Sequence, residues 1–303
     1  MSTPLKLQTT KLVDSHQHAF FQGHDDRYLV RDMDSLGINY SWLLTWEIPP
    51  GDPSTEYVQF LNPFRVRPDG THPGIVLEDL ILVQNRHPNR FVLGYCPAPT
   101  VSKPWKLLRA AHDMYGVRVC GEWKFRIPFD DPRCLELFRA AGKLNMPVVL
   151  HLDVPYLKNP DGVWNYQSRW YGGTVANLER ALEACPETVF IGHAPGFWRE
   201  IGLGADEVSE AYPEGIVSGE GRLYRLFDSY PNLYADLSAS GFLALRRDQK
   251  HARTFLTRFQ DRLLFGRDFC DSNLYDLIAS LDLETEVLEN ICWRNAEKLV
   301  LAP

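Results

Sequence analysis

Residues 12–18 read LVDSHQH, and both the fold and the chemistry of the chain can be developed from this stretch. An apolar lead-in followed by polar residues is typical of a short β-strand, in which side chains two positions apart point to the same face. His16 and His18 therefore lie side by side if the stretch is a strand. Neutral imidazoles are good zinc ligands, so the pair would supply half of a metal site. Two surface histidines on a hairpin or loop would give the same pattern. The residues later in the chain distinguish these two interpretations.

The composition is that of an ordinary globular protein. The 303 residues are 45% hydrophobic and 23% charged, and α/β barrels reach this length as one domain. A net charge of −7 argues against a general nucleic-acid binder. The six cysteines form no CxxC pair, which is typical of reduced thiols in the cytoplasm. The polar N-terminus and the lack of a long apolar run indicate neither secretion nor a membrane span.

The pattern beyond residue 18 predicts a (β/α)8 barrel. Short apolar runs alternate with helix-like stretches, and three long segments at about residues 49–71, 153–173 and 194–219 show no clear periodicity. Eight strands that are each followed by a helix or a long loop indicate one TIM-barrel domain over residues 1–303, with long βα loops. The expected strands are residues 12–18, 40–46, 91–96, 117–125, 147–152, 189–193, 233–237 and 262–266. Helices are expected at residues 75–86, 105–115, 133–144, 174–184, 274–280, 285–290 and 295–299.

Residues that can carry chemistry fall where such a barrel places its active site, at the C-terminal ends of the strands. Each of them alone is more often structural, because a lone histidine is commonly a satisfied core residue and a lone aspartate a turn former. Their coincidence at the ends of separate strands is what predicts a metal site. They are His16 and His18 on the first strand, Glu122 and Lys124 on the fourth, His151 on the fifth, His193 at the end of the sixth and Asp268 after the eighth.

Several motifs occur in a telling order: DSHQH at residues 14–18, a histidine on the fifth strand, IGH at 191–193 and LLFGRD at 263–268. Together they resemble the amidohydrolase superfamily, and more narrowly its amidohydrolase-related branch of metal-dependent hydrolases, which also contains decarboxylases. The ending ICWRNAEKL at 291–299 is similar to the closing helix of that branch. The likeness runs from about residue 12 to residue 301 and implies a TIM-barrel metalloenzyme that acts on a small molecule.

Position by position, the resemblance implies that His16 and His18 are the first metal ligands and that His151 and Asp268 complete the site. His193 would be a ligand of a second metal or the group that polarises the substrate. Such a set suits zinc, as one or two divalent ions, with manganese as an alternative. An open coordination position would hold a water whose pKa falls toward about 7. Asp268 would accept the proton of that water and later deliver it to the leaving group.

The fourth strand leaves alternatives open. Glu122 and Lys124 stand two apart and should share a face. In the family, a glutamate or a carboxylated lysine from this strand bridges two metals, so Glu122 is a candidate bridging ligand. Lys124 could take the lysine version of that role or offset the charge of an anionic substrate. A plain ion pair between the two residues is the structural alternative, and the number of metals stays open.

The loops carry aromatic residues and arginines over the expected barrel mouth. With Lys124, Trp46 and Arg169 are the candidates for substrate binding, although most such residues would pack the loops onto the barrel or form contacts between subunits of a homo-oligomer. Arg267 stands where the family often has a small residue. It could pair with Asp268 or bind a substrate carboxylate, but we expect a structural ion pair elsewhere. Asp236 on the seventh strand could support a ligand.

The leading functional hypothesis is a metal-dependent hydrolase of a C–O or C–N bond in a lactone, ester or amide. The alternative on the same frame is a non-oxidative decarboxylase or hydratase of an aromatic or unsaturated acid. A barrel that binds a ligand without catalysis is the alternative from another class, and the intact set of histidines and acids argues against it. Substrate identity is not readable, because specificity in such barrels resides in the loops.

Overall fold

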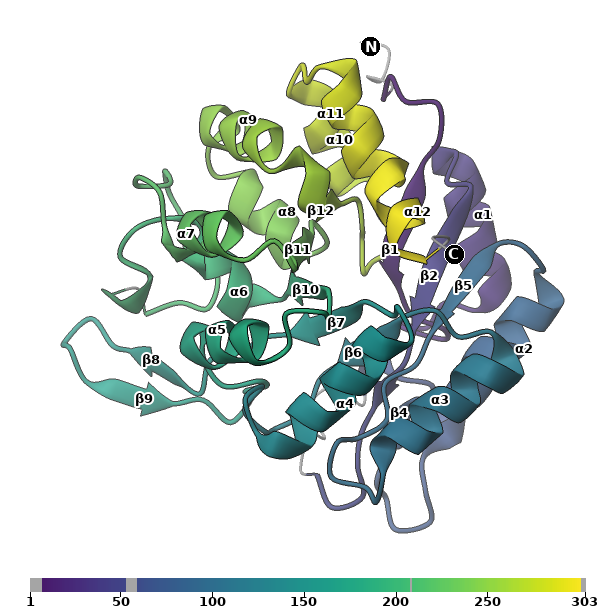
Figure 1. The fold of residues 1–303 in the computed structure, drawn as a ribbon. Coiled ribbons are helices and arrows are strands. Elements are labelled where there is room, and N and C mark those ends of the chain that lie inside the picture. Colours follow the sequence, from purple (N-terminus) through teal and green to yellow (C-terminus); the bar gives the residue numbers. More distant parts are fainter. Residues whose placement is uncertain (1–6, 53–58, 208, 301–303) are drawn as a thin grey trace.

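The computed structural model describes residues 7–52, 59–207 and 209–300, and its parallel strands form a barrel with helices around it (Figure 1). The strands pair in two runs, β1-β2-β5 and β12-β11-β10-β7-β6, and every pairing within them is parallel. The barrel strands are β1 (Val13–Gln17), β2 (Tyr40–Leu44), β5 (Phe91–Gly94), β6 (Cys120–Trp123), β7 (Val148–His151), β10 (Phe190–His193), β11 (Leu233–Asp236) and β12 (Leu263–Leu264).

Hydrogen bonds beyond the regular strands close the two runs into a ring. Between β5 and β6, Gly94 forms a parallel bridge with Val119, and the Tyr95 N–H donates to the Val119 carbonyl at 2.9 Å. Between β12 and β1, the Ser15 N–H donates to the Phe265 carbonyl at 2.9 Å. The predicted (β/α)8 barrel is confirmed.

The barrel interior is a packed apolar layer beneath the strand ends. Val149, Ile191 and Tyr234 are buried and belong to one cluster with residues of the other strands. Each stands two positions before a polar residue at the end of its strand, namely His151, His193 and Asp236. Because side chains alternate along a strand, the polar residues point into the barrel directly above this apolar layer.

A second apolar layer joins the barrel to the surrounding helices, whose ends follow local capping chemistry. Asp131 caps α4 by accepting from the Arg133 N–H, with Pro132 in the first turn, and Thr174 and Asn177 form a capping box on α5. The helices are α1 (Asp26–Leu36), α2 (Leu77–Arg86), α3 (Pro104–Tyr115), α4 (Pro132–Lys143), α5 (Val175–Ala184), α6 (Pro195–Trp198), α7 (Arg222–Ser229), α8 (Ser240–Leu245), α9 (Gln249–Arg258), α10 (Asn273–Ser280), α11 (Thr285–Glu289) and α12 (Asn295–Val300). In the described part of the chain, no helix has the length and apolarity to cross a membrane.

The three long segments without periodicity contain or adjoin short elements that the sequence pattern did not reveal. The segment at 49–71 follows β3 (Trp46–Glu47), which pairs with β4 (Gly74–Ile75); its residues 53–58 lie outside the described residues. The segment at 153–173 holds a hairpin of β8 (Tyr156–Lys158) and β9 (Trp164–Tyr166), which projects from the barrel (Figure 1). The segment at 194–219 begins with α6. Each of these elements has only two to four residues and no apolar run of its own, which explains why they were missed.

Candidate metal centre

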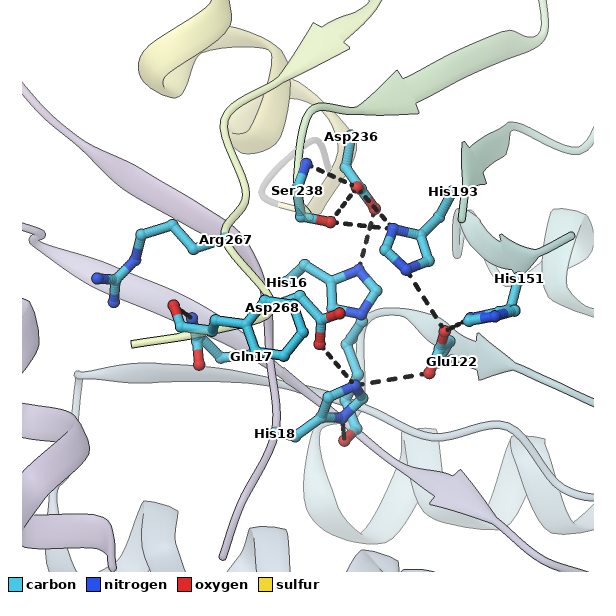
Figure 2. A network of polar contacts seen from close by, with 12 residues as sticks. His16, Gln17, His18, Glu122, His151, His193, Asp236, Ser238, Arg267 and Asp268 are labelled. Carbon is cyan, nitrogen blue, oxygen red and sulfur yellow. Dashed lines mark hydrogen bonds and ion pairs between the residues drawn. The ribbon is translucent and has the colours of Figure 1, made fainter. Parts of the chain in front are cut away.

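The C-terminal ends of the strands surround a cavity of about 400 Å³. Five of the six predicted metal-binding and catalytic residues line this cavity, and the sixth, His16, lies fully buried behind them. Figure 2 shows their side chains directed toward one another from separate strands. The five are His18, Glu122, His151, His193 and Asp268.

One buried carboxylate holds two of the histidines. Asp236, at the end of β11, places Oδ2 3.0 Å from Nδ1 of His16 and Oδ1 3.0 Å from Nδ1 of His193. An ionised carboxylate only accepts hydrogen bonds, so each histidine donates its Nδ1–H, and Nε2 is the nitrogen that a cation could bind in place of a proton. Burial lowers the pKa of His16, but Asp236, with smaller contributions from Asp268 and Glu122, raises it to about 9. The pocket therefore attracts positive charge.

His18 is oriented by the backbone. Its Nδ1 donates to the Leu44 carbonyl at 2.9 Å, which directs Nε2 into the cluster. There Nε2 lies 3.5 Å from Oε2 of Glu122 and 3.6 Å from Oδ1 of Asp268. Burial lowers the pKa of His18, so this ring favours the neutral form that binds a metal.

Glu122 occupies the middle of the cluster. Its Oε1 lies 2.5 Å from Nδ1 of His151 and 3.8 Å from Nε2 of His193, while Oε2 faces His18. Burial raises the pKa of Glu122, but Lys124 and His151 outweigh it and hold the pKa well below its usual range. Glu122 is thus a buried, ionised carboxylate among histidines from separate strands, and its oxygen could hold a cation together with His16 and His193.

His151 is held differently from the other three histidines. Carboxylates face both ring nitrogens, because Glu122 contacts Nδ1 and Asp153 Oδ2 lies 3.0 Å from Nε2. Burial and Lys124 lower the pKa of His151, but the two carboxylates outweigh them and raise it. Among the described residues, the groups whose ligand atoms lie within 4.8 Å of one another are His16, Glu122 and His193, and His16, His18 and Asp268. His151 is in neither group, so the expectation that it completes the site with His16, His18 and Asp268 stays a prediction.

The cluster fits a divalent cation. Nε2 of His16 is buried, and no described residue offers it a hydrogen bond. An orphaned buried nitrogen is costly, and a metal would satisfy it. The Nε2 lone pairs of His16, His18 and His193 converge with the oxygens of Glu122 and Asp268 in the two groups of ligand atoms. This mixture of nitrogen and carboxylate donors suits zinc and also manganese.

Asp268 stands at the border between the cluster and the cavity. Its side chain is 15% exposed, whereas those of His18 and Glu122 are 2% exposed. Its backbone is left-handed, with φ of 66°, and its N–H donates to the His16 carbonyl at 2.8 Å. Strained backbone of this kind persists where surrounding contacts hold it, and it often occurs at functional sites.

Arg267 forms its ion pairs with residues other than Asp268, as expected from the sequence. Its Nε donates to Oδ2 of Asp14 at 2.8 Å, and its guanidinium also contacts Asp32 at 2.7 Å. Both Arg267 and Asp14 have fully buried side chains. The arginine therefore stabilises the junction of β1, α1 and the segment after β12.

Two of the three candidate substrate-binding residues reach the cavity. Lys124 and Trp46 both line it, and the Lys124 ammonium lies 3.8 Å from the centre of the Trp46 ring, a cation–π contact. Arg169 is exposed near the β8–β9 hairpin and is not among the described residues that line the cavity. The structure thus brings Lys124 and Trp46 to the cluster, but not Arg169.

Two further polar residues were not singled out from the sequence: Asp153, which lines the cavity, and Ser238, which contacts Asp236 and His193 behind it. Asp153 and Ser238 each stand two positions after a site residue, His151 and Asp236, and strand alternation was the only signal that could have found them. Above the cluster the walls are apolar and largely aromatic. They include Phe21, Phe60, Phe242, Leu243, Phe269 and Leu274.

Comparisons with known proteins agree with the barrel fold. The sequence model of the family described as Amidohydrolase matches residues 77–301, whereas no curated protein matches the chain. A similar solved structure is an uncharacterized TIM-barrel protein from Bordetella bronchiseptica, with a TM-score of 0.62, 15% identity and coverage of 96% of this chain and 98% of that one. A probable 2-pyrone-4,6-dicarboxylic acid hydrolase from Acinetobacter baumannii has a TM-score of 0.55, 13% identity and coverage of 96% and 99%. A dihydroxybenzoic acid decarboxylase from Polaromonas with bound manganese has a TM-score of 0.57, 14% identity and coverage of 96% and 97%.

At such identities the solved structures show the fold, and the family match shows the class. Residues 77–301 make up most of the chain, and the chain belongs to the amidohydrolase family. It is accordingly a metal-dependent enzyme of the amidohydrolase superfamily.

Proposed function

We propose that the protein hydrolyses a C–O or C–N bond of a small molecule, such as a lactone, ester or amide, with one or two divalent cations. The observation that supports this most is the position of Glu122, whose carboxylate faces His18 through one oxygen and His151 and His193 through the other. The cations would be held by His16, His18, Glu122, His193 and Asp268, and His151 would join them by turning away from Asp153. We expect zinc, with manganese as the alternative.

When bound, the cation supplies Lewis acidity, which polarises a carbonyl group and makes water a better nucleophile near neutral pH. The proton chemistry belongs to the chain. Asp268 is partly exposed to the cavity and lies 3.6 Å from His18, so it can accept a proton from attacking water and return it to the leaving group. His193 is fixed by Asp236 with Nε2 directed into the cavity, where it can bind a cation or face the substrate carbonyl.

Lys124 and Trp46 support a substrate that carries an anionic group. The ammonium at the cavity wall can pair with a carboxylate, and the Trp46 ring beside it offers a flat apolar surface. The phenylalanines above would bury an apolar or planar body of the substrate. Excluding water from this space would strengthen the ionic contacts below.

Decarboxylation of an aromatic or unsaturated acid is the second candidate. The same Lys124 ammonium could hold the carboxylate of such a substrate, and the similar solved structures include a dihydroxybenzoic acid decarboxylase. In that case Asp268 or His193 would handle the proton at carbon rather than at oxygen.

The test begins with the metal content of the purified protein. We expect at least one zinc or manganese per chain, loss of activity on chelation and recovery when the metal is returned. His16→Ala should lose metal and activity, and Asp268→Asn should lower kcat by about 10²- to 10⁴-fold. His112→Ala, in the last turn of α3 away from the cavity, is the control.

Incorporation of solvent ¹⁸O into the product indicates hydrolysis, whereas CO2 release without such incorporation indicates decarboxylation. Full activity of metal-free His16→Ala and Asp268→Asn variants would sink the proposal.

A further inference from the structure

We propose that Asp236 is a positioning residue that fixes the tautomers of His16 and His193 together, and that it does so asymmetrically. The inference rests on the proposed metal site only in that both histidines are taken to bind through Nε2. The carboxylate is completely buried and joins β11 to β1 on one side and to β10 on the other (Figure 2). The rings that it holds lie only 4.3 Å apart.

The two oxygens of Asp236 have unequal surroundings. Oδ1 receives the Ser238 backbone N–H at 3.2 Å and the Ser238 hydroxyl, in addition to His193 Nδ1. The same hydroxyl oxygen lies 2.9 Å from His193 Nδ1 and can accept from it while donating to Oδ1. Oδ2 receives His16 Nδ1 at 3.0 Å. A backbone N–H can only donate, so the atom in the Oδ1 position has to be an acceptor whatever residue stands at position 236. The Oδ2 position carries no such constraint from the backbone.

This asymmetry predicts which histidine fails when the carboxylate becomes an amide. In Asp236→Asn, the amide oxygen should stay at the Oδ1 position, because an NH₂ group there would face the Ser238 N–H donor to donor. The NH₂ group then occupies the Oδ2 position and donates to Nδ1 of His16. A neutral imidazole that accepts at Nδ1 carries its proton on Nε2. His16 can then no longer offer an Nε2 lone pair, whereas His193 still can.

The experiment is histidine-selective ¹⁵N NMR on the zinc-loaded protein without substrate, in which protonated, lone-pair and metal-bound ring nitrogens are distinguished. In the wild type we expect Nδ1–H and metal-bound or unprotonated Nε2 for both His16 and His193. In Asp236→Asn we expect Nε2–H on His16 only. Zinc affinity should fall by about 10- to 100-fold, as is typical when the partner of a ligating histidine is lost.

His18 is the internal control, because its Nδ1 donates to the Leu44 carbonyl and does not contact Asp236. Ser238→Ala is the matched variant: it removes the hydroxyl but keeps the backbone N–H, and both histidines should keep their wild-type tautomers. An Nε2–H on His193 instead of His16, or no change in either ring, would overturn the inference. If Asp236→Asn does not fold, an Nε2–H on either histidine in the wild-type spectrum would overturn it. None of these readouts depends on whether the enzyme hydrolyses or decarboxylates its substrate.

Discussion

The side chain of Glu47 has a raised pKa, because no nearby positive charge fully offsets the effect of burial on its carboxylate. It lies on β3, where it pairs with Gly74 of β4. Burial raises the pKa of Glu47 to about 7 from its ordinary value of 4.5, and the opposing attraction of Arg67 does not cancel this effect. Folding therefore favours the protonated form of this side chain.

We expect Glu47→Gln to stabilise the protein at alkaline pH and not at acid pH. Below pH 4.5 the folded and unfolded wild type both hold the proton. Between pH 4.5 and about 7 the unfolded chain releases it first, so wild-type stability falls as pH rises and then levels off. Glutamine does not titrate, so the Glu47→Gln variant keeps its stability as pH rises. Above pH 7 its free energy of unfolding should exceed that of the wild type by on the order of 2–3 kcal/mol. Urea unfolding at pH 4.5 and pH 8 measures it, with the exposed Glu136→Gln on α4 as control. Equal gains at the two pH values would contradict the assignment.

For individual residues, the sequence predicted which side chains would lie close together but not which hydrogen-bond partners would orient each of them. Histidine and aspartate at the ends of separate strands converge whatever the loops do, because the barrel fixes where strands end. The partners on the far side of each ring are set by side-chain rotation. The sequence suggested that Asp236 could support a ligand, but it did not indicate that Asp236 serves both His16 and His193 or that Asp153 engages His151.

The junction between β10 and α6 shows strain at the scale of an element. Ala194 directly follows His193 and has φ of 79° and ψ of 169°, a region that is essentially restricted to glycine. Two positions earlier, Gly192 lies against the ring of the buried Phe197, and a Cβ at Gly192 would overlap that ring. Thus Ala194 adopts a backbone conformation that only glycine adopts without strain, whereas Gly192 occupies a position where no side chain fits.

Substitutions at these two positions should have opposite effects on stability. Ala194→Gly should raise the free energy of unfolding by about 1 kcal/mol, because relief of roughly 1–3 kcal/mol of strain exceeds the added chain entropy of glycine. Gly192→Ala should lower it by about 1–3 kcal/mol through overpacking against Phe197. Chemical denaturation of both variants tests the pair. Destabilisation by Ala194→Gly would show that the alanine side chain contributes more packing than its backbone costs.

Buried strands and capped helices were predictable, and short exposed elements were not. The strands β7 and β10 and the helices α4 and α5 appear where apolar runs and caps indicated them, within a few residues. The β8–β9 hairpin was read as loop because three-residue strands with side chains more than half exposed, such as Trp164 and Tyr166, carry no burial pattern.

For the whole molecule, Arg267 joins the two ends of the barrel. It contacts Asp14 of β1, 253 residues earlier in the sequence, and Asp32 of α1, and its side chain is fully buried. These contacts supplement the hydrogen bond between Ser15 and Phe265 that closes the ring.

Removing this arginine should be costly. Arg267→Met leaves two carboxylates without their cation, one of them fully buried, and should lower the free energy of unfolding by about 3–5 kcal/mol. Arg258→Met is the matched control, because Arg258 also contacts two carboxylates, Glu220 and Asp228, but all three side chains are well exposed. The free energy of unfolding of Arg258→Met should fall by no more than about 1 kcal/mol. Urea unfolding of both variants distinguishes a closing contact from an ordinary surface ion pair.

The spread of the cluster over the whole barrel has a consequence during biosynthesis. His16 and His18 are translated about 250 residues before Asp268, whose backbone bonds to His16. A nascent or truncated chain that ends before β12 holds two histidines without their carboxylate and has no closed ring to orient them. In the proposed metal site, stable binding of the ion would thus wait until β12 and Asp268 have been made, and shorter chains would compete poorly for the cell's supply of the ion.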